Sequence, residues 1–284
     1  MLLTSVSAEF SPKVELSGMK RFEHKSNPLV GHLVRVAVRL GLGRGRLKQM
    51  FARAWQVAVG TGPVDVVYHG IKFRLFPVGN TIESKILFSS RRREGKELNA
   101  LAGVLSGGGV FLDIGANIGY YSMMAAHFGA SAVCAIEANP DLAERCQQHA
   151  DINGFGAIVR VVPCALGGAF GKARLYLGSE DLGSSSVVKP STDGGFLDVE
   201  MRPLLDVLQS SQVVAIDAMK IDVEGMESQI LKPFFEAAAP ALYPKMMIIE
   251  DSSQADWDWH VIDWMLANGY QIKDRSRGNL ILTR

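Results

Sequence analysis

Val110-Phe-Leu-Asp-Ile-Gly-Ala-Asn-Ile-Gly119 is the stretch that decides the fold of this 284-residue chain. An apolar strand ends at Asp113, a glycine-rich turn follows, and apolar residues at helical spacing resume near Tyr120. A strand–turn–helix unit of this kind places its turn at the carboxyl edge of a parallel sheet, where ligands bind. Glycine is needed where the backbone turns tightly or approaches a ligand without a Cβ in the way, and Gly115 and Gly119 meet that need.

Short apolar runs alternate with helical stretches from Val110 onward, which is typical of a parallel sheet with crossover helices. The expected strands are Val110–Asp113, Ala132–Glu137, Ile158–Pro163, Ala218–Asp222, Met246–Glu250, Tyr270–Asp274 and Asn279–Thr283. The expected helices are Tyr120–Phe128, Pro140–Asn153, Met226–Ala238 and Asp256–Asn268. The connection from Gly167 to Arg202 is long, with a glycine- and serine-rich centre at Gly183–Ser186, so we expect it to add a hairpin and a flap over the site.

The N-terminal part of the chain is expected to form an extension of the main domain, which we place at residues 106–284. Residues 1–60 form a basic, helical segment: nine Lys or Arg and one acid lie between Lys20 and Arg53. A β-hairpin over Val64–Pro77 and a helix from Ile82 to Leu105 complete residues 61–105. The basic segment is interpreted as a solvated helical face, with docking on a membrane or a synthase partner as an alternative.

Composition indicates a compact protein: 48% of the residues are hydrophobic, 21% are charged and the net charge is +1. The three cysteines have neither the even number of a disulfide framework nor the spacing of a zinc site. The sequence contains no apolar run of the length needed to cross a membrane and no secretory leader pattern in its first 30 residues. We therefore expect a soluble, cytoplasmic protein.

An acid at the end of the second strand points to a nucleoside cofactor. Glu137 follows Asp113 by 24 residues, and a carboxylate there can accept both ribose hydroxyls of an adenosine. A dinucleotide fingerprint would also need glycine at positions 117 and 120, where this chain has Asn117 and Tyr120. A cofactor without phosphate is therefore favoured, and a nicotinamide-dependent oxidoreductase is kept as an alternative.

A second charged cluster lies in Met219-Lys-Ile-Asp-Val-Glu-Gly225 at the end of a central strand. Lys220, Asp222 and Glu224 occupy alternate positions, so they can lean to one side. Strands of a parallel sheet are covered on both faces, and charges there need partners or a ligand to offset desolvation. The alternative is an ion pair that only fixes the strand end. Glu250, after the next strand, reaches the same edge; no metal is expected, although these acids are of a type that Mg²⁺ accepts.

Two motifs together resemble the FkbM-type methyltransferases: Asp113-Ile-Gly-Ala-Asn-Ile-Gly-Tyr-Tyr-Ser122 and Lys220-Ile-Asp-Val-Glu-Gly-Met-Glu227. The similarity runs from about residue 68 to the end and includes Glu94, Leu205-Asp206 and Glu250. It departs from the family where Gly95 replaces a proline and Pro233 replaces a glycine. The resemblance implies an α/β, Rossmann-like class I methyltransferase fold with a seven-stranded, mostly parallel sheet whose last strand is antiparallel. It also implies S-adenosylmethionine as the methyl donor and, most often, transfer to a hydroxyl oxygen of a sugar, glycan or natural product.

The resemblance also assigns roles to site residues. The expected cofactor-binding residues are Asp113, Gly115, Asn117 and Gly119 around the methionine end, Glu137 at the ribose, and Asn139 and Ala165 near the adenine. Asp222 and Glu224 are expected to bind the acceptor and act as base, with Lys220 tuning them; His260 is an alternative base. A nucleic-acid methyltransferase remains an alternative because the basic segment can track phosphates, although no Asn-Pro-Pro-Tyr type motif follows the fourth strand.

Overall fold

The computed structural model describes residues 63–76, 79–88, 95–178, 183, 185–187, 195–252, 254–276 and 278–284, together with position 36. Apart from that position, the basic helices expected over residues 1–60 lie outside the described residues. So do Glu94 and residues 179–182 and 188–194 of the expected flap.

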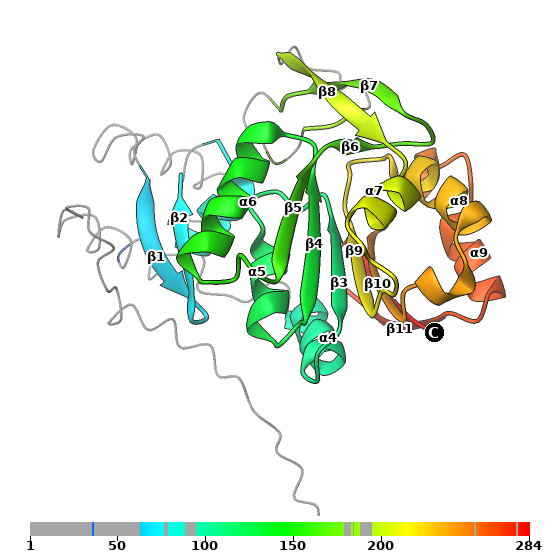
Figure 1. The fold of residues 1–284 in the computed structure, drawn as a ribbon, viewed down its shortest axis with the longest axis horizontal. Coiled ribbons are helices and arrows are strands. Elements are labelled where there is room, and N and C mark those ends of the chain that lie inside the picture. Colours follow the sequence, from blue (N-terminus) through cyan, green and yellow to red (C-terminus); the bar gives the residue numbers. More distant parts are fainter. Residues whose placement is uncertain are drawn as a thin grey trace, which may run out of the picture.

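A seven-stranded sheet forms the centre of the molecule, in the order β11-β12-β10-β9-β3-β4-β5 (Figure 1). Its strands are β3 Val110–Ile114, β4 Ala132–Glu137, β5 Val159–Pro163, β9 Ala218–Ile221, β10 Met246–Glu250, β11 Gln271–Arg275 and β12 Asn279–Thr283. Strands β10, β9, β3, β4 and β5 are parallel, whereas β12 is antiparallel to both β10 and β11. The predicted Rossmann-like sheet with an antiparallel last strand is confirmed.

Helices cover both faces of this sheet (Figure 1). They are α4 Gly95–Leu105, α5 Tyr120–His127 and α6 Pro140–Ile152 on one face, and α7 Leu204–Ser210, α8 Glu227–Ala237 and α9 Val261–Ala267 on the other. Along β3, Phe111 packs into the first of the two hydrophobic clusters and Leu112 into the second, both fully buried. Because both faces are covered, the strands read as continuous apolar runs instead of alternating ones.

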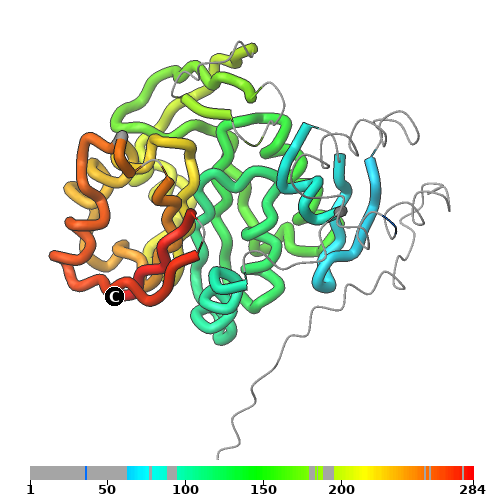
Figure 2. Tube along the Cα trace, turned by 180° about the vertical axis from the view of Figure 1, so that it is seen from behind, coloured from blue at the N-terminus to red at the C-terminus, as the bar shows by residue number. Residues whose placement is uncertain are grey.

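The predicted hairpin is present as β1 Val64–Tyr68 and β2 Ile71–Leu75, at the opposite end of the molecule from the C-terminal strands (Figure 2). The hairpin shares the hydrophobic cluster of α5 and α6, in which Phe73 is fully buried. His149 of α6 joins it to the turn after β3: Nδ1 lies 2.8 Å from the carbonyl of Ile118, and Nε2 accepts the amide of Arg74 at 3.1 Å. Burial lowers the pKa of His149, which keeps the ring in the neutral form that this pattern requires.

The single helix predicted from Ile82 to Leu105 is wrong. The structure has two helices there, α3 Thr81–Phe88 and α4 Gly95–Leu105. The sequence between them, residues 89–94, contains no apolar residue with which a continued helix could pack. Short 3-10 turns also occur at Pro240–Leu242 (η3) and at Gln254–Asp256 (η4), so the last helix begins at Val261 and not at Asp256.

The long connection after β5 forms a small second sheet above the carboxyl edge of the main one (Figure 1). The hairpin predicted there is β7 Gly171–Tyr176 and β8 Phe196–Arg202, and β6 Ala165–Leu166 pairs parallel with β8. Helix α7, which follows β8, was not expected from the sequence. The domain boundaries at residues 60 and 105 remain predictions.

Candidate active site

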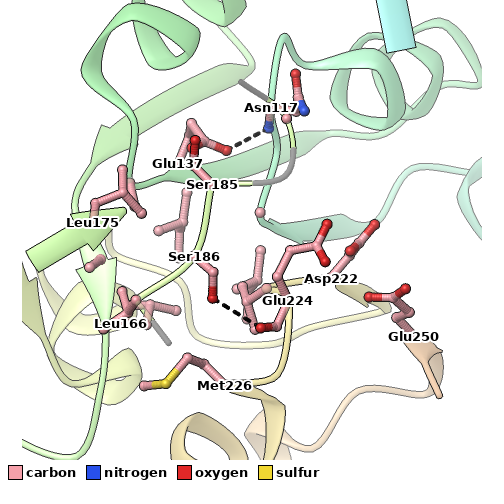
Figure 3. Close-up of a pocket in the computed structure, with 18 of the residues that line it drawn as sticks. Asn117, Glu137, Leu166, Leu175, Ser185, Ser186, Asp222, Glu224, Met226 and Glu250 are labelled. Atoms are coloured by element: carbon pink, nitrogen blue, oxygen red, sulfur yellow. Dashed lines mark hydrogen bonds between the residues drawn. The ribbon is translucent and has the colours of Figure 1, made fainter. Parts of the chain in front are cut away.

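A cavity of about 310 Å³ lies at the carboxyl ends of β3, β4, β9 and β10. Its floor includes Gly115 and Asn117 from the turn after β3, and α3 and residues 185–187 form other walls. Figure 3 shows Glu137 at one end and the carboxyl groups of Asp222, Glu224 and Glu250 together at the other. Glu137 and the acids of the Lys220–Glu227 motif therefore line one cavity.

The backbone amides of the turn after β3 donate hydrogen bonds to acceptors within the protein. The amide of Asn117 donates to Glu137 Oε2 at 2.7 Å, that of Ile118 to Asn117 Oδ1 at 2.8 Å, and that of Gly119 to the carbonyl of Ala116 at 2.8 Å. A helix start binds phosphate through amides that point at the ligand. Here a pyrophosphate would have to displace acceptors of the chain itself, which agrees with a cofactor that lacks phosphate.

The glycines of this turn avoid clashes within the protein. Gly115 has φ +74°, and a Cβ built on it would lie 1.9 Å from the carbonyl oxygen of Asp222. Gly119 has φ +82°, and its Cβ would lie 2.5 Å from Cys146 Sγ. Gly115 lines the cavity, whereas Gly119 lies outside its lining. The sequence reasoning anticipated a tight turn, but it did not show that the close approach is to β9 and α6.

Glu137 is the one acid at its end of the cavity among the residues described. Its Oε1 accepts the amide of Asn139 at 2.8 Å and its Oε2 that of Asn117. Burial raises the pKa of Glu137, and the two amides oppose that rise. A carboxylate oxygen has more than one acceptor position, so both oxygens can still accept hydroxyl groups from a ligand.

Two predicted cofactor residues lie beneath the cavity surface. Asp113 is 1% exposed and accepts Ser122 Oγ at 2.6 Å through Oδ2, while its buried Oδ1 has no donor among the described residues. Asn139 caps α6 by accepting the amide of Asp141 at 3.0 Å. Neither lines the cavity, whereas Ala165 does. The roles of all three in cofactor binding stay predictions.

The ion pair that the sequence left open as an alternative is present at the end of β9, between Lys220 and Asp222. Lys220 Nζ lies 3.0 Å from Asp222 Oδ2, and Lys220 is 5% exposed, with Nζ 5.1 Å from the centre of the Tyr121 ring. In the sheet Lys220 pairs with Asp113 of β3. Burial alone would raise the pKa of Asp222, but the charge and hydrogen bond of Lys220 hold it below its usual value. Lys220 thus keeps Asp222 ionised at the cavity wall.

The pKa of Glu250 is shifted in the opposite direction from that of Asp222. Burial, and then the negative charge of Asp222, raise the pKa of Glu250 to about 7. The side chain lines the cavity beside Asp222 (Figure 3). Two neighbouring carboxyl groups with different proton affinities are a common feature of acid–base sites.

The loop that carries Glu224 is held from below by Glu227. Glu227 is fully buried, and its Oε1 and Oε2 accept the amides of Val223 at 3.0 Å and Gly225 at 3.1 Å. Trp257 Nε1 also donates to Oε2 at 3.2 Å. Glu224 itself is exposed and has φ 53°. The second acid of the motif therefore reaches the cavity because Glu227 fixes the backbone beneath it.

Helix α3 is a wall of the cavity that sequence reasoning missed. Thr81, Ile82 and Lys85 line it, and Asn80 fixes the helix start by accepting the amides of Ile82 at 2.9 Å and of Glu83 at 3.1 Å. Asn80 Nδ2 also donates to Asn117 Oδ1 at 2.9 Å. The spacing of an Asn three residues before a Glu marks a helix start, but it does not show which cavity the helix will cover.

Other candidates lie outside the cavity lining. His260 is exposed and precedes α9. Within the described ranges there is no group of three or more His, Cys, Asp or Glu side chains placed to hold a metal ion. The helices described there also include none with the length and apolar character of a membrane span.

Residues 113–272 match the family model described as the methyltransferase FkbM domain, which is more than half of the chain. A comparison of the sequence with curated proteins found no match.

Solved structures with a similar fold include TrmK from M. capricolum in complex with S-adenosyl-homocysteine, at 13% identity and a TM-score of 0.39. That match covers 66% of this chain and 66% of the other, slightly under two thirds of its length. TYW2 from M. jannaschii in complex with AdoMet has 13% identity and a TM-score of 0.40, with coverages of 78% and 83%. The O-methyltransferase from Bacillus cereus in complex with SAH has 15% identity and a TM-score of 0.40, with coverages of 68% and 80%. At such identities the likeness concerns the fold.

Proposed function

Because the chain belongs to the methyltransferase FkbM domain family, we propose that it transfers a methyl group to a hydroxyl oxygen of a sugar, glycan or natural product. Membership of this family supports the sequence prediction of a methyltransferase. The donor S-adenosylmethionine, the methylated atom and the class of acceptor are the proposed part.

The observation that carries the proposal is the division of one cavity into two ends. Glu137 can accept hydroxyls at one end, and apolar side chains such as Ile114 and Ile136 beside it suit a flat base. Asp222, Glu224 and Glu250 supply negative charge at the other end, which suits a sulfonium. The residues present therefore fit S-adenosylmethionine. A nicotinamide dinucleotide fits less well, because the amides of Asn117 and Ile118 in the turn after β3 already donate to acceptors of the protein and its pyrophosphate would need such amides.

The bound donor supplies a methyl group on positively charged sulfur, already a good leaving group. As the O–CH₃ bond forms, the S–CH₃ electron pair stays on sulfur and the hydroxyl proton must go to a base. We propose that Asp222 and Glu224 orient the hydroxyl and take that proton. Lys220 assists by keeping Asp222 ionised through the 3.0 Å pair. Aligning the two reactants supplies much of the remaining rate enhancement.

Charge also favours a neutral acceptor over a nucleic acid. Three carboxyl groups gather where the acceptor would enter, and like charges there would repel a phosphate backbone. Lys85 of α3 is the one basic residue among the described residues that line this cavity. Nucleic-acid methylation therefore remains only an alternative, and docking of a membrane or synthase through residues 1–60 stays a prediction.

The proposal is tested by supplying donor with a tritiated methyl group to a panel of neutral sugars, glycans, hydroxylated natural products and RNA. Label is expected in a hydroxyl compound, as an ether identified by NMR, and Glu137→Ala should abolish its transfer because the donor is no longer held. Label that appears in RNA alone would overturn the proposed acceptor class, while label in an amine or a thiol would overturn the proposed atom.

A further inference from the structure

We propose that Asp222 and Glu250 act as one proton store that responds to the charge of the bound donor. The pair holds a proton in the free protein and gives it up when positive charge binds at this end of the cavity. This inference rests on the proposed function for the identity of the positive charge, and it adds Glu250 to the residues that govern the proton.

The first support is the hydrogen bonding of Glu250. Its Oε1 accepts Ser252 Oγ, while its Oε2 is buried and has no donor among the described residues. A buried carboxylate oxygen without a donor is costly. A proton on Glu250 turns that oxygen into a donor toward the neighbouring carboxylate, Asp222, and removes the cost.

The second support is the unequal treatment of the two acids. Asp222 has Lys220 Nζ at 3.0 Å, whereas Glu250 has the Asp222 charge beside it and no lysine within salt-bridge distance among the described residues. Two carboxylates that share a site do not both ionise readily. The pKa of Glu250, about 7, agrees with a proton that resides on Glu250 while Asp222 stays ionised.

With one proton on the pair, the positive and negative charges in and around it nearly cancel. Lys220 of β9 contacts Asp222, Lys85 of α3 acts on Asp222 across the cavity, and Glu224 adds a negative charge near Glu250. On its other side, β12 places the neutral Asn279 opposite Glu250. A cation that enters the cavity therefore takes over the role of the proton, because both neutralise the same excess negative charge.

The consequence is that Glu250 becomes a proton acceptor beside the ionised Asp222 only when the donor is bound. S-adenosylmethionine carries a sulfonium charge, whereas its product S-adenosylhomocysteine is a neutral thioether. Donor binding should release the proton from the pair, so that the pair can accept the proton of the hydroxyl group. Once the positive charge has gone, the pair again favours the protonated state, which helps to retain the proton taken from the acceptor.

The test is calorimetric titration of the full chain at pH 7 in two buffers with different ionisation enthalpies, which measures protons exchanged on binding. Since the pKa of Glu250 is about 7, S-adenosylmethionine should release about half a proton more than S-adenosylhomocysteine. Glu250→Gln should remove this difference while both ligands still bind. Glu224→Gln leaves both carboxyl groups of the pair in place but removes a charge that helps to raise the pKa of Glu250, so it should reduce this difference without removing it.

Carboxyl ¹³C NMR of glutamate-labelled wild-type protein gives an independent measurement. One glutamate should titrate near pH 7 in the free protein and at lower pH with S-adenosylmethionine bound. Equal proton release with the two ligands, or a difference that survives Glu250→Gln, would overturn the inference and leave the proposed function intact. If neither ligand binds, the proposed function itself fails, and the inference fails with it.

Discussion

Gly115→Ala is expected to lower the free energy of unfolding by roughly 2–5 kcal/mol, combining the cost of a left-handed backbone with that of an overpacked contact. The residue has φ +74°, and its new Cβ would lie 1.9 Å from the carbonyl oxygen of Asp222. That neighbour is backbone at the end of β9, so relief requires β3 and β9 to separate. The melting temperature should fall by roughly 2–4 °C per kcal/mol in thermal denaturation.

Gly108→Ala is the matched control for this substitution. Gly108 also has a positive φ, +93°, but a Cβ there meets nothing within 4 Å. Its cost should be about 1–2 kcal/mol, that of the backbone conformation alone. If the two variants were equally stable, the close contact between Gly115 and Asp222 would not constrain the protein, and our account of the turn would be wrong.

Asp222→Asn is expected to reduce turnover of an identified acceptor by roughly 10²–10⁴-fold, the usual contribution of a positioned acid–base group. The amide keeps the size of the side chain but can no longer take a proton. Affinity for S-adenosylhomocysteine, measured by calorimetry, should change far less than turnover, because Glu137 holds the other end of that ligand in our account.

Glu224→Gln separates the two acids assigned to acceptor binding. Glu224 is exposed and its loop is fixed by Glu227, whereas Asp222 is tied to buried Lys220. We expect the smaller loss of turnover from Glu224→Gln. Turnover of Asp222→Asn equal to that of the wild type would remove Asp222 from the mechanism, and a larger loss in Glu224→Gln would transfer the role to Glu224.

The sheet could be predicted because its signals are local. Each buried strand is a short apolar run, and the acids at the ends of β3, β4 and β9 interrupt those runs where a parallel sheet places its ligand edge. The motif residues Glu137 and Asp222 then meet in one cavity for a topological reason: their strands lie on either side of β3. The order of the strands was not predicted; the family resemblance implied only a seven-stranded, mostly parallel sheet with an antiparallel last strand.

The remaining features depend on contacts between residues far apart in the sequence. The hydrogen bond from Asn80 to Asn117 brings α3 to the cavity, and neither residue shows this in its local pattern. The same holds for the contact of Gly119 with Cys146. The raised pKa of Glu250 depends on a neighbouring strand and a buried environment, which periodicity alone does not reveal.

We propose that Glu137 and the turn after β3 hold S-adenosylmethionine, and calorimetric titration with S-adenosylhomocysteine and NADH tests this most directly. We predict saturable binding of S-adenosylhomocysteine and none of NADH. Glu137→Ala should weaken binding by roughly 100-fold or more, since two charge-assisted hydrogen bonds are lost, whereas Glu144→Ala, at an exposed acid of α6, should not weaken it. Binding of NADH, or of neither compound, would contradict the account.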